Sequence, residues 1–221
     1  MKVLVVNTSL NGTASEMDML LIPFIKGATE SGAEVECVNT SNLIINPCRA
    51  CTDDASFESK GICDCQDDMQ KLYPKFRESE VWVFASPLTS KKTSDKLFNI
   101  LDRLEPLFEN SFDAILSKKN EFKGRIAFLS TSSSYNKDCF NEFEKEFKNF
   151  SRLYSKEFAG SLLRPHSWAM ISLNELGIRV NDILDAAYEA GKQIVKTGKI
   201  SHSIAKVVSR TLVPDDITYI S

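Results

Sequence analysis

The sequence predicts an α/β fold in which a five-stranded parallel sheet is covered by helices on both faces. Two observations support this prediction. Short apolar segments alternate along the 221 residues with longer segments whose apolar residues recur every three or four positions, which is the pattern of strands alternating with helices. Strands that are joined through helices run parallel. Three of the apolar segments also lead directly into loops rich in hydroxyl side chains, where folds of this class bind ligands.

Five segments have the length and the composition of strands. The first and the third are apolar on both faces, whereas the second alternates apolar residues with glutamate, which is typical of an edge strand with one solvated face. The five segments are residues 3–6, 33–38, 81–86, 125–130 and 158–163. The doubly wound arrangement of five such strands has the order 2-1-3-4-5. Its ligand lies at the carboxyl ends of strands 1, 3 and 4.

Helices are predicted between these strands from apolar residues at helical spacing. Glu16 opens the first helix, Pro23 is expected to kink it or to delay its start, and Gly32 ends it. Asp67 or Asp68 is expected to cap the next helix. The remaining apolar stripes predict helices around residues 97–104, 139–154 and 181–197, with one further short helix within 201–212.

Composition and charge exclude several classes of function. The net charge of −3 and the absence of a basic face argue against a nucleic-acid partner. No apolar run reaches membrane-spanning length, and the chain enters a strand without a signal-peptide pattern, so we expect a cytoplasmic protein without a membrane partner.

No linker or repeat interrupts the pattern. A single domain is predicted over residues 1–221, with a cysteine-containing excursion at 39–66 and a C-terminal helical tail at 199–221.

The loop after the first strand is a candidate phosphate site. Residues 7–15 contain hydroxyls, amides and one glycine but no charge, and the helix follows at once. The backbone N–H groups of such a loop and the helix N-terminus can bind a phosphate. An ordinary strand-to-helix turn has a similar composition, and the loop is neither a Walker loop nor a GxGxxG motif.

Two further polar loops favour the phosphate-site interpretation. Residues 87–94 follow the third strand and residues 131–135 follow the fourth. The predicted topology brings all three loops to one edge of the sheet. A mononucleotide bound there would place its phosphate on the first loop and its ring between the other two.

Four of the six cysteines lie close together in the sequence. They are Cys48, Cys51, Cys63 and Cys65. In a reducing compartment such a cluster indicates metal or redox chemistry more than structural disulfides. Four thiolates in one loop suffice for a [4Fe–4S] cluster or for Zn²⁺. Reduced thiols or a labile disulfide are the alternative.

The two histidines and the second tryptophan do not point to a mechanism. His166 and His202 lie in no pattern of a catalytic triad or of a metal site, and for His166 we expect a packing or surface position. Trp168 follows a Pro-His turn. It either covers a ligand or a subunit contact, or it packs in the core.

Six segments in sequence order carry the motifs of one protein family. They are TSLNGTAS (8–15), GATESGAEVE (27–36), PCRAC (47–51), CDCQDDM (63–69), SPLTSKKTSDKLFNILDRL (86–104) and GSLLRP (160–165). Through these segments the chain resembles the NAD(P)H-dependent FMN reductase and iron–sulfur flavoprotein group of the flavodoxin-like superfamily. The first loop is shorter than that of the group and lacks its basic residue.

The resemblance implies a flavodoxin-like fold, non-covalently bound FMN and NAD(P)H as the substrate. Electrons would pass through FMN to a small-molecule acceptor such as a flavin or a quinone. No catalytic side chain is implied, because the proximity of nicotinamide and flavin is sufficient for the transfer. A homodimer or a homotetramer is implied as well.

The resemblance also implies which residues bind the cofactor. The first loop would hold the phosphate, and the other two loops would contact the edges of the flavin ring. Lys91 or Lys92 is a candidate for a positive charge near flavin N1, although a solvated helix start explains both lysines equally well. The implied residues are Ser9, Asn11, Gly12, Thr13, Ala14, Ser15, Pro87, Leu88, Thr89, Ser90, Lys91, Thr131, Ser132, Ser133, Ser134 and Tyr135.

Two alternatives remain open. The first is an iron–sulfur flavoprotein that carries electrons, with a cluster on the loop from Cys48 to Cys65. Cys48 and Cys51 match the first two positions of the group's cluster motif and Cys63 matches the last. Asp54 occupies the third position, so Cys65 would have to supply the missing thiolate. The second is a degenerate flavodoxin-like binding module without catalysis.

Overall fold

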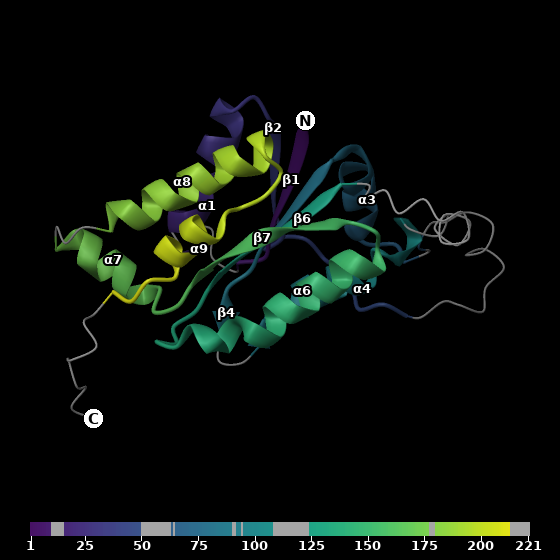
Figure 1. Cartoon of the computed structure of the whole chain (residues 1–221). Helices are drawn as coiled ribbons and strands as arrows, with labels where there is room; N and C mark the ends of the chain where they lie inside the picture. Colours follow the sequence, from purple (N-terminus) through teal and green to yellow (C-terminus); the bar gives the residue numbers. More distant parts are fainter. Residues whose placement is uncertain are drawn as a thin grey trace.

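The computed structural model describes residues 1–9, 16–49, 63, 65–89, 92–93, 95–107, 124–176 and 180–212. Its centre is a sheet of five strands (Figure 1) in which every neighbouring pair runs parallel. Across the sheet the strands are β2 (Glu34–Asn39), β1 (Lys2–Asn7), β3 (Val81–Ala85), β6 (Arg125–Thr131) and β7 (Glu157–Arg164). The predicted fold class and the order 2-1-3-4-5 are therefore confirmed.

Helices cover both faces of the sheet, as Figure 1 shows. On one face lie α1 (Glu16–Glu30), α7 (Trp168–Glu175), α8 (Asn181–Lys196) and α9 (His202–Val208); on the other lie α3 (Met69–Glu78), α4 (Asp95–Asp102) and α6 (Asn141–Leu153). Alternate residues of β1 supply the two cores: Val3 and Val5 pack in the first, and Leu4 and Val6 in the second. This division follows from the alternation of side chains along a strand.

The first helix packs closely against α8. A methyl group at Gly27 would lie 2.0 Å from the carbonyl oxygen of Tyr188, and one at Gly191 would lie 2.0 Å from that of Phe24. Both positions therefore require glycine. The predicted stop at Gly32 is confirmed, because Gly32 has a φ of +93° and ends the helix in the left-handed region. Pro23 lies inside α1, which begins at Glu16 as predicted.

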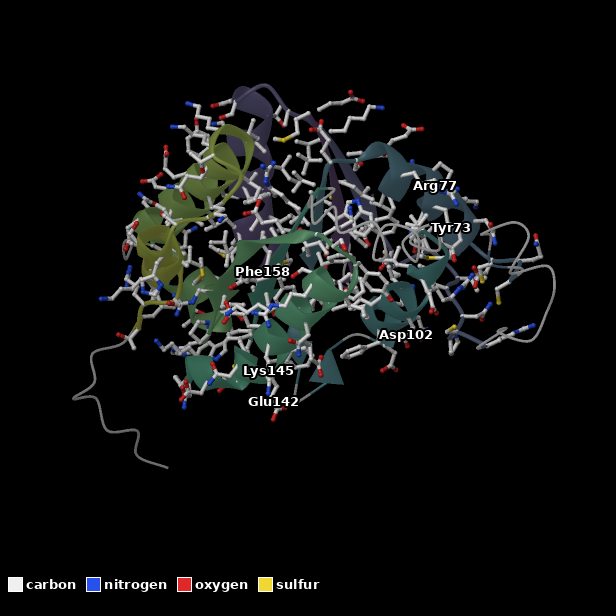
Figure 2. The ribbon with its side chains drawn as sticks, turned by 45° about the vertical axis from the view of Figure 1, so that its right-hand side comes forward. Tyr73, Arg77, Asp102, Glu142, Lys145 and Phe158 are labelled. Carbon is white, nitrogen blue, oxygen red and sulfur yellow. The ribbon has the colours of Figure 1, made fainter. Side chains whose placement is uncertain are left out.

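The phenylalanine-rich segment forms an amphipathic helix, as predicted. The 3₁₀ turn η2 (Lys137–Phe140) leads into α6, whose Phe147 side chain is buried against the sheet. Glu142 and Lys145 lie on the opposite, exposed side of α6 (Figure 2). A second 3₁₀ turn, η1 (Glu105–Leu107), follows α4.

Several local expectations differ from the structure. The edge strand β2 is largely exposed on both faces, and Cys37, which the alternation of apolar residues with glutamate assigns to the inward face, is exposed. The loop after β3 contains a two-stranded hairpin, β4 (Leu88–Thr89) with β5 (Lys92–Thr93). Residues 168–175 form α7, which the sequence pattern does not predict. None of the described helices is long and apolar enough to cross a membrane.

The cysteine-containing excursion is tied to α3 by two aspartates. The Asp67 carboxylate accepts the Met69 backbone N–H at 3.0 Å, whereas Asp68 makes no side-chain capping bond and accepts the Ile44 N–H at 2.8 Å. Of the two residues proposed as the cap, Asp67 therefore performs that role. The described residues between 39 and 66 contain no helix or strand beyond Asn39.

Candidate functional site

Hydroxyl hydrogen bonds connect the carboxyl ends of three strands. The Thr8 hydroxyl, just after β1, donates to the Ser86 hydroxyl, just after β3, at 2.8 Å. The Ser130 hydroxyl in β6 donates to the Ser86 carbonyl at 2.7 Å. All three residues are buried. The structure therefore brings the starts of the three predicted loops together at one edge of the sheet.

Ser9 begins the first loop and has an unusual side chain. The Ser9 backbone N–H donates to the Asn7 side-chain oxygen at 3.0 Å, and Ser9 is 3% exposed. Its buried hydroxyl makes no hydrogen bond with any described residue. A buried hydroxyl without a partner carries a free-energy cost, and a phosphate oxygen would satisfy it. Ser9 therefore fits the phosphate of a mononucleotide. Asn11, Gly12, Thr13, Ala14 and Ser15 lie outside the described residues.

The second loop adjoins the third. Pro87 is half-buried and Leu88 is buried, and Leu88 forms a parallel bridge with Ser132. The backbone of Thr89 lies in the hairpin. Ser90 and Lys91 lie outside the described residues. The predicted positive charge near the flavin from Lys91 or Lys92 remains a prediction.

The third loop turns outward as it leaves β6. Thr131 and Ser132 are buried, Ser133 is exposed, Ser134 is half-buried, and Tyr135 is 49% exposed. The Ser132 hydroxyl accepts the Ser134 N–H at 3.1 Å, which closes a local turn. The loop therefore places buried hydroxyls at its base and an aromatic ring at its tip.

Two residues that follow β7 fix the position of this third loop through backbone hydrogen bonds. The His166 N–H donates to the Ser134 carbonyl at 2.7 Å, and the Ser167 N–H donates to the Ser132 carbonyl at 2.9 Å. The buried Ser167 hydroxyl also donates to the carboxylate of Glu16, the first residue of α1. No motif in the sequence assigns a role to Ser167. Its position after the fifth strand, at the same edge as the three loops, is the signal that the sequence offers.

His166 packs between two aromatic side chains. The centre of its ring lies 4.0 Å from that of Tyr135 and 4.7 Å from that of Trp168. His166 is buried, as the packing interpretation predicted, and its φ of +53° is in the left-handed region. Burial and the nearby Arg164 lower the pKa of His166, which keeps the imidazole neutral at pH 7.

The structure separates the cysteines by environment. Cys48 is exposed, Cys63 is half-buried and Cys65 is buried, and Cys51 lies outside the described residues. Within the described ranges, no three His, Cys, Asp or Glu side chains are grouped to hold a metal ion. The predicted metal set of Cys48, Cys51, Cys63 and Cys65 remains a prediction.

A buried ion pair joins the second cysteine motif to α4. Arg103 and Asp67 form a salt bridge in which both side chains are at most 1% exposed. A second guanidinium nitrogen of Arg103 lies 3.6 Å from the Cys63 sulfur, and the Tyr73 hydroxyl donates to the Arg103 carbonyl at 2.8 Å. Tyr73 and Asp102 lie on the same side of the molecule (Figure 2). Burial and the neighbouring Cys63 raise the pKa of Tyr73.

Comparison with known protein families and curated proteins extends these observations. A family model described as NADPH-dependent FMN reductase matches residues 1–149. An iron-sulfur flavoprotein of Archaeoglobus fulgidus is 34% identical over 95 residues, which cover 43% of this chain and 40% of that protein. An iron-sulfur flavoprotein of Methanosarcina thermophila is 31% identical over 111 residues, covering 49% and 52% respectively. The matches thus span about half of each curated relative or less.

Solved structures share the fold. A flavone reductase superimposes with a TM-score of 0.63 at 21% identity, covering 89% of this chain and 62% of that chain. An NAD(P)H:quinone oxidoreductase from Methanothermobacter marburgensis gives 0.61 at 14% identity, covering 88% and 96%. An FMN-dependent NADH-azoreductase from Bacillus anthracis, solved in complex with FMN, gives 0.57 at 13% identity, covering 88% and 98%.

The family match includes the starts of all three loops, from Thr8 through Ser86 to Ser130. It spans well over half of the 221 residues. The predicted family is thereby confirmed. The chain belongs to the NADPH-dependent FMN reductase family.

Proposed function

We propose that this protein is an FMN-dependent oxidoreductase that takes hydride from NAD(P)H and passes electrons to a small-molecule acceptor. The observation that carries the proposal is the convergence of three polar loops at one sheet edge, all within the part of the chain that matches the family. The Ser9 hydroxyl, which has no hydrogen-bond partner among the described residues, supports it, because it lies where the phosphate is expected.

Each loop has a separate role in this proposal. Ser9 and the segment from Asn11 to Ser15 hold the phosphate through hydroxyl and backbone N–H groups, without a positive charge. Pro87 to Lys91 and Thr131 to Tyr135 hold the two edges of the ring. When bound, FMN supplies the hydride and electron chemistry. The protein binds, orients and encloses it. A cytoplasmic homodimer or homotetramer remains a prediction.

Flavin binding and reduction test the proposal. The purified protein is incubated with excess FMN, separated from unbound flavin and examined for the visible absorption of bound flavin. Anaerobic addition of NADPH or NADH is expected to bleach that absorption at a rate proportional to protein concentration. A protein that stays colourless after this treatment contradicts the proposal and favours the binding-module alternative. Flavin that binds but is not reduced by either nucleotide contradicts the hydride step.

An iron–sulfur electron carrier is the second candidate. The names of two relatives favour it, together with the contact between the Cys63 sulfur and Arg103, which ties one cysteine to the fold. Iron and acid-labile sulfide are measured on protein purified without oxygen, in the wild type and in Cys63→Ser. Stoichiometric iron and sulfide that Cys63→Ser removes would support the cluster, and their absence from the wild type would exclude it.

A further inference from the structure

Cys63 packs against the buried side chain of Arg103. The thiol is half-buried and keeps contact with solvent, whereas the Arg103 side chain is fully buried. Nη2 of Arg103 donates to the Cys63 sulfur, 3.6 Å away. The hydroxyl of Tyr73 (Figure 2) in turn donates to the Arg103 carbonyl at 2.8 Å, which holds Arg103 just after the end of α4. A fixed positive charge therefore lies beside a sulfur that a small solute can reach.

The hydrogen-bond donors of this guanidinium are only partly used. Nη1 donates to the carboxylate of Asp67 and, at 3.2 Å, to the carbonyl of Asn46. Nε and Nη2 form the neighbouring edge of the group, from which two N–H bonds point in parallel. Nη2 meets the Cys63 sulfur, but Nε is buried and makes no hydrogen bond with any described residue. The edge that faces Cys63 therefore has a donor that no described residue uses.

An oxygen atom on the Cys63 sulfur would meet this donor. A thiol offers a single, weak acceptor atom, whereas a sulfenic acid carries an oxygen bonded to the sulfur. The parallel donors of a guanidinium edge match two neighbouring acceptor atoms, which here are the sulfur and its new oxygen. The bonds to Asp67 and Asn46 use Nη1 and are compatible with this arrangement. The positive charge also stabilises the anionic form of a sulfenic acid.

The backbone of Cys63 is fixed relative to this edge. The side-chain amide of Gln70 donates to the carbonyls of Cys63 and Cys65, the latter at 3.0 Å. Cys65 itself is buried. Cys139 is half-buried like Cys63, but within the described ranges no guanidinium N–H donates to its sulfur. Of these three cysteines, Cys63 is the one that combines contact with solvent and a cationic donor.

We propose that Cys63 is a modification site that hydroperoxides oxidise reversibly to a sulfenic acid, which Arg103 stabilises. The Cys63 sulfur attacks one oxygen of hydrogen peroxide, and the O–O bond breaks. That oxygen stays on the sulfur, while the other leaves as hydroxide and takes up the thiol proton to give water. The sulfur loses two electrons to the peroxide. A small thiol then condenses with the sulfenic acid to give a disulfide and water, and a second thiol molecule releases the Cys63 thiol.

The test measures sulfenic acid at each cysteine of the full chain. Protein purified in air is analysed for iron and zinc, exposed to hydrogen peroxide together with dimedone, which captures sulfenic acids, and digested for peptide mass spectrometry. Cys63 is expected to be labelled about tenfold faster than Cys139, the internal control. Dithiothreitol added before dimedone should remove the label. Equal labelling rates of the two cysteines overturn the inference, as does protection of Cys63 by bound iron or zinc.

Arg103→Lys separates the guanidinium edge from its charge. Lysine keeps a positive charge for Asp67 but has a single nitrogen in place of the edge, so labelling of Cys63 should fall about tenfold. Arg77→Lys, the same change at an exposed arginine of α3, is the matched control and leaves the rate unchanged.

Equal labelling of Cys63 in the wild type and a folded Arg103→Lys overturns the role of Arg103. If that variant does not fold, the comparison of Cys63 with Cys139 in the wild type decides. The inference does not depend on the proposed function, because neither FMN nor NAD(P)H takes part. Labelling of Cys63 in a protein that takes up no FMN therefore supports the inference while the proposed function fails.

Discussion

The hydroxyl of Ser167 donates a hydrogen bond to the carboxylate of Glu16, 151 positions away in the chain. The Ser167 hydroxyl also lies 3.0 Å from the Ser132 carbonyl, which accepts the Ser167 N–H at 2.9 Å. A hydroxyl has one proton to donate, and the charged Glu16 carboxylate is a stronger acceptor than the neutral carbonyl. Through Ser167, the helix that follows the loop proposed to hold the phosphate is connected to the loop proposed beside the flavin ring.

The first prediction follows from this connection. Ser167→Ala removes a hydrogen bond to a charged group, an interaction of about 1.5–3 kcal/mol. We expect the Kd for FMN, measured by quenching of flavin fluorescence, to rise about tenfold, because the two loops are no longer held together. Ser172→Ala, at an exposed position of α7, is the control. A lower Tm with an unchanged Kd would show that Ser167 only stabilises the fold.

The second prediction concerns Ser9. Because its buried hydroxyl makes no bond with a described residue, Ser9→Ala is expected to leave the Tm of the flavin-free protein unchanged or slightly higher. The same substitution should weaken FMN binding at least tenfold, because a hydrogen bond to a charged phosphate is lost. Ser130→Ala provides the contrast. It removes the 2.7 Å bond to the Ser86 carbonyl and should lower the Tm without FMN. Equal FMN affinity in the wild type and Ser9→Ala would refute the phosphate assignment.

The sheet and the position of the site can be predicted from the sequence for a physical reason. Strands buried on both faces, such as Val81–Ala85, are continuous apolar runs, and the polar residues that follow them mark the carboxyl edge. The edge strand is less predictable. Cys37 follows the expected alternation, but β2 has one neighbouring strand, and the residue is exposed.

The features that the sequence does not predict either join residues that lie far apart in the chain or show no helical repeat. Apolar residues occupy the four consecutive positions 168–171, so α7 shows no helical repeat before its neighbours are known. Ser167 and Glu16 lie far apart in the sequence, and no local pattern pairs them. No local pattern pairs Arg103 with Asp67 either, because their contact depends on the packing of α4 beside the cysteine-containing excursion.

The third prediction concerns the buried pair of Arg103 and Asp67. Arg103→Met leaves the Asp67 carboxylate buried without its charge partner, and we expect a loss of about 3–5 kcal/mol in the free energy of unfolding. Asp182→Asn breaks a partly exposed pair with Arg210 and should cost about 1 kcal/mol or less. Urea titration measures both. A loss for Arg103→Met no larger than that of the surface control would contradict a buried, energetically coupled pair.

The same pair predicts a dependence on acid. Burial alone would raise the pKa of Asp67, but the hydrogen bond and charge of Arg103 hold it below its usual value. A carboxyl whose pKa is lower in the folded state stabilises the fold above its unfolded pKa of about 4. This contribution is lost as the pH falls through the lower, folded pKa. Asp67→Asn should therefore reduce the loss of stability between neutral pH and pH values below about 4. If Asp67→Asn leaves the loss of stability at low pH unchanged, the result contradicts a lowered pKa of Asp67 in the folded state.

The fifth prediction concerns Lys156, a buried lysine whose ammonium lies 3.8 Å from the centre of the Trp82 ring. Burial lowers the pKa of Lys156 to about 8. Since the unfolded chain binds this proton more tightly, with a pKa of about 10.4, the free energy of unfolding should rise with pH between about 8 and 10.4. The total rise is about 3 kcal/mol. Below pH 8 the full cost of the buried charge is present, and this group contributes no slope.

Lys156→Met isolates this contribution. The variant should show no rise of stability in that pH range, so that any advantage over the wild type at pH 7 shrinks as the pH approaches 10. Lys148→Met removes a partly exposed lysine that lies 5.6 Å from the Phe158 ring and should leave the slope unchanged. Urea titrations at several pH values measure the slopes. If the rise in the free energy of unfolding with pH is the same in Lys156→Met as in the wild type, another group causes it. The charged ammonium of Lys156 is then accommodated beside Trp82 without the expected cost.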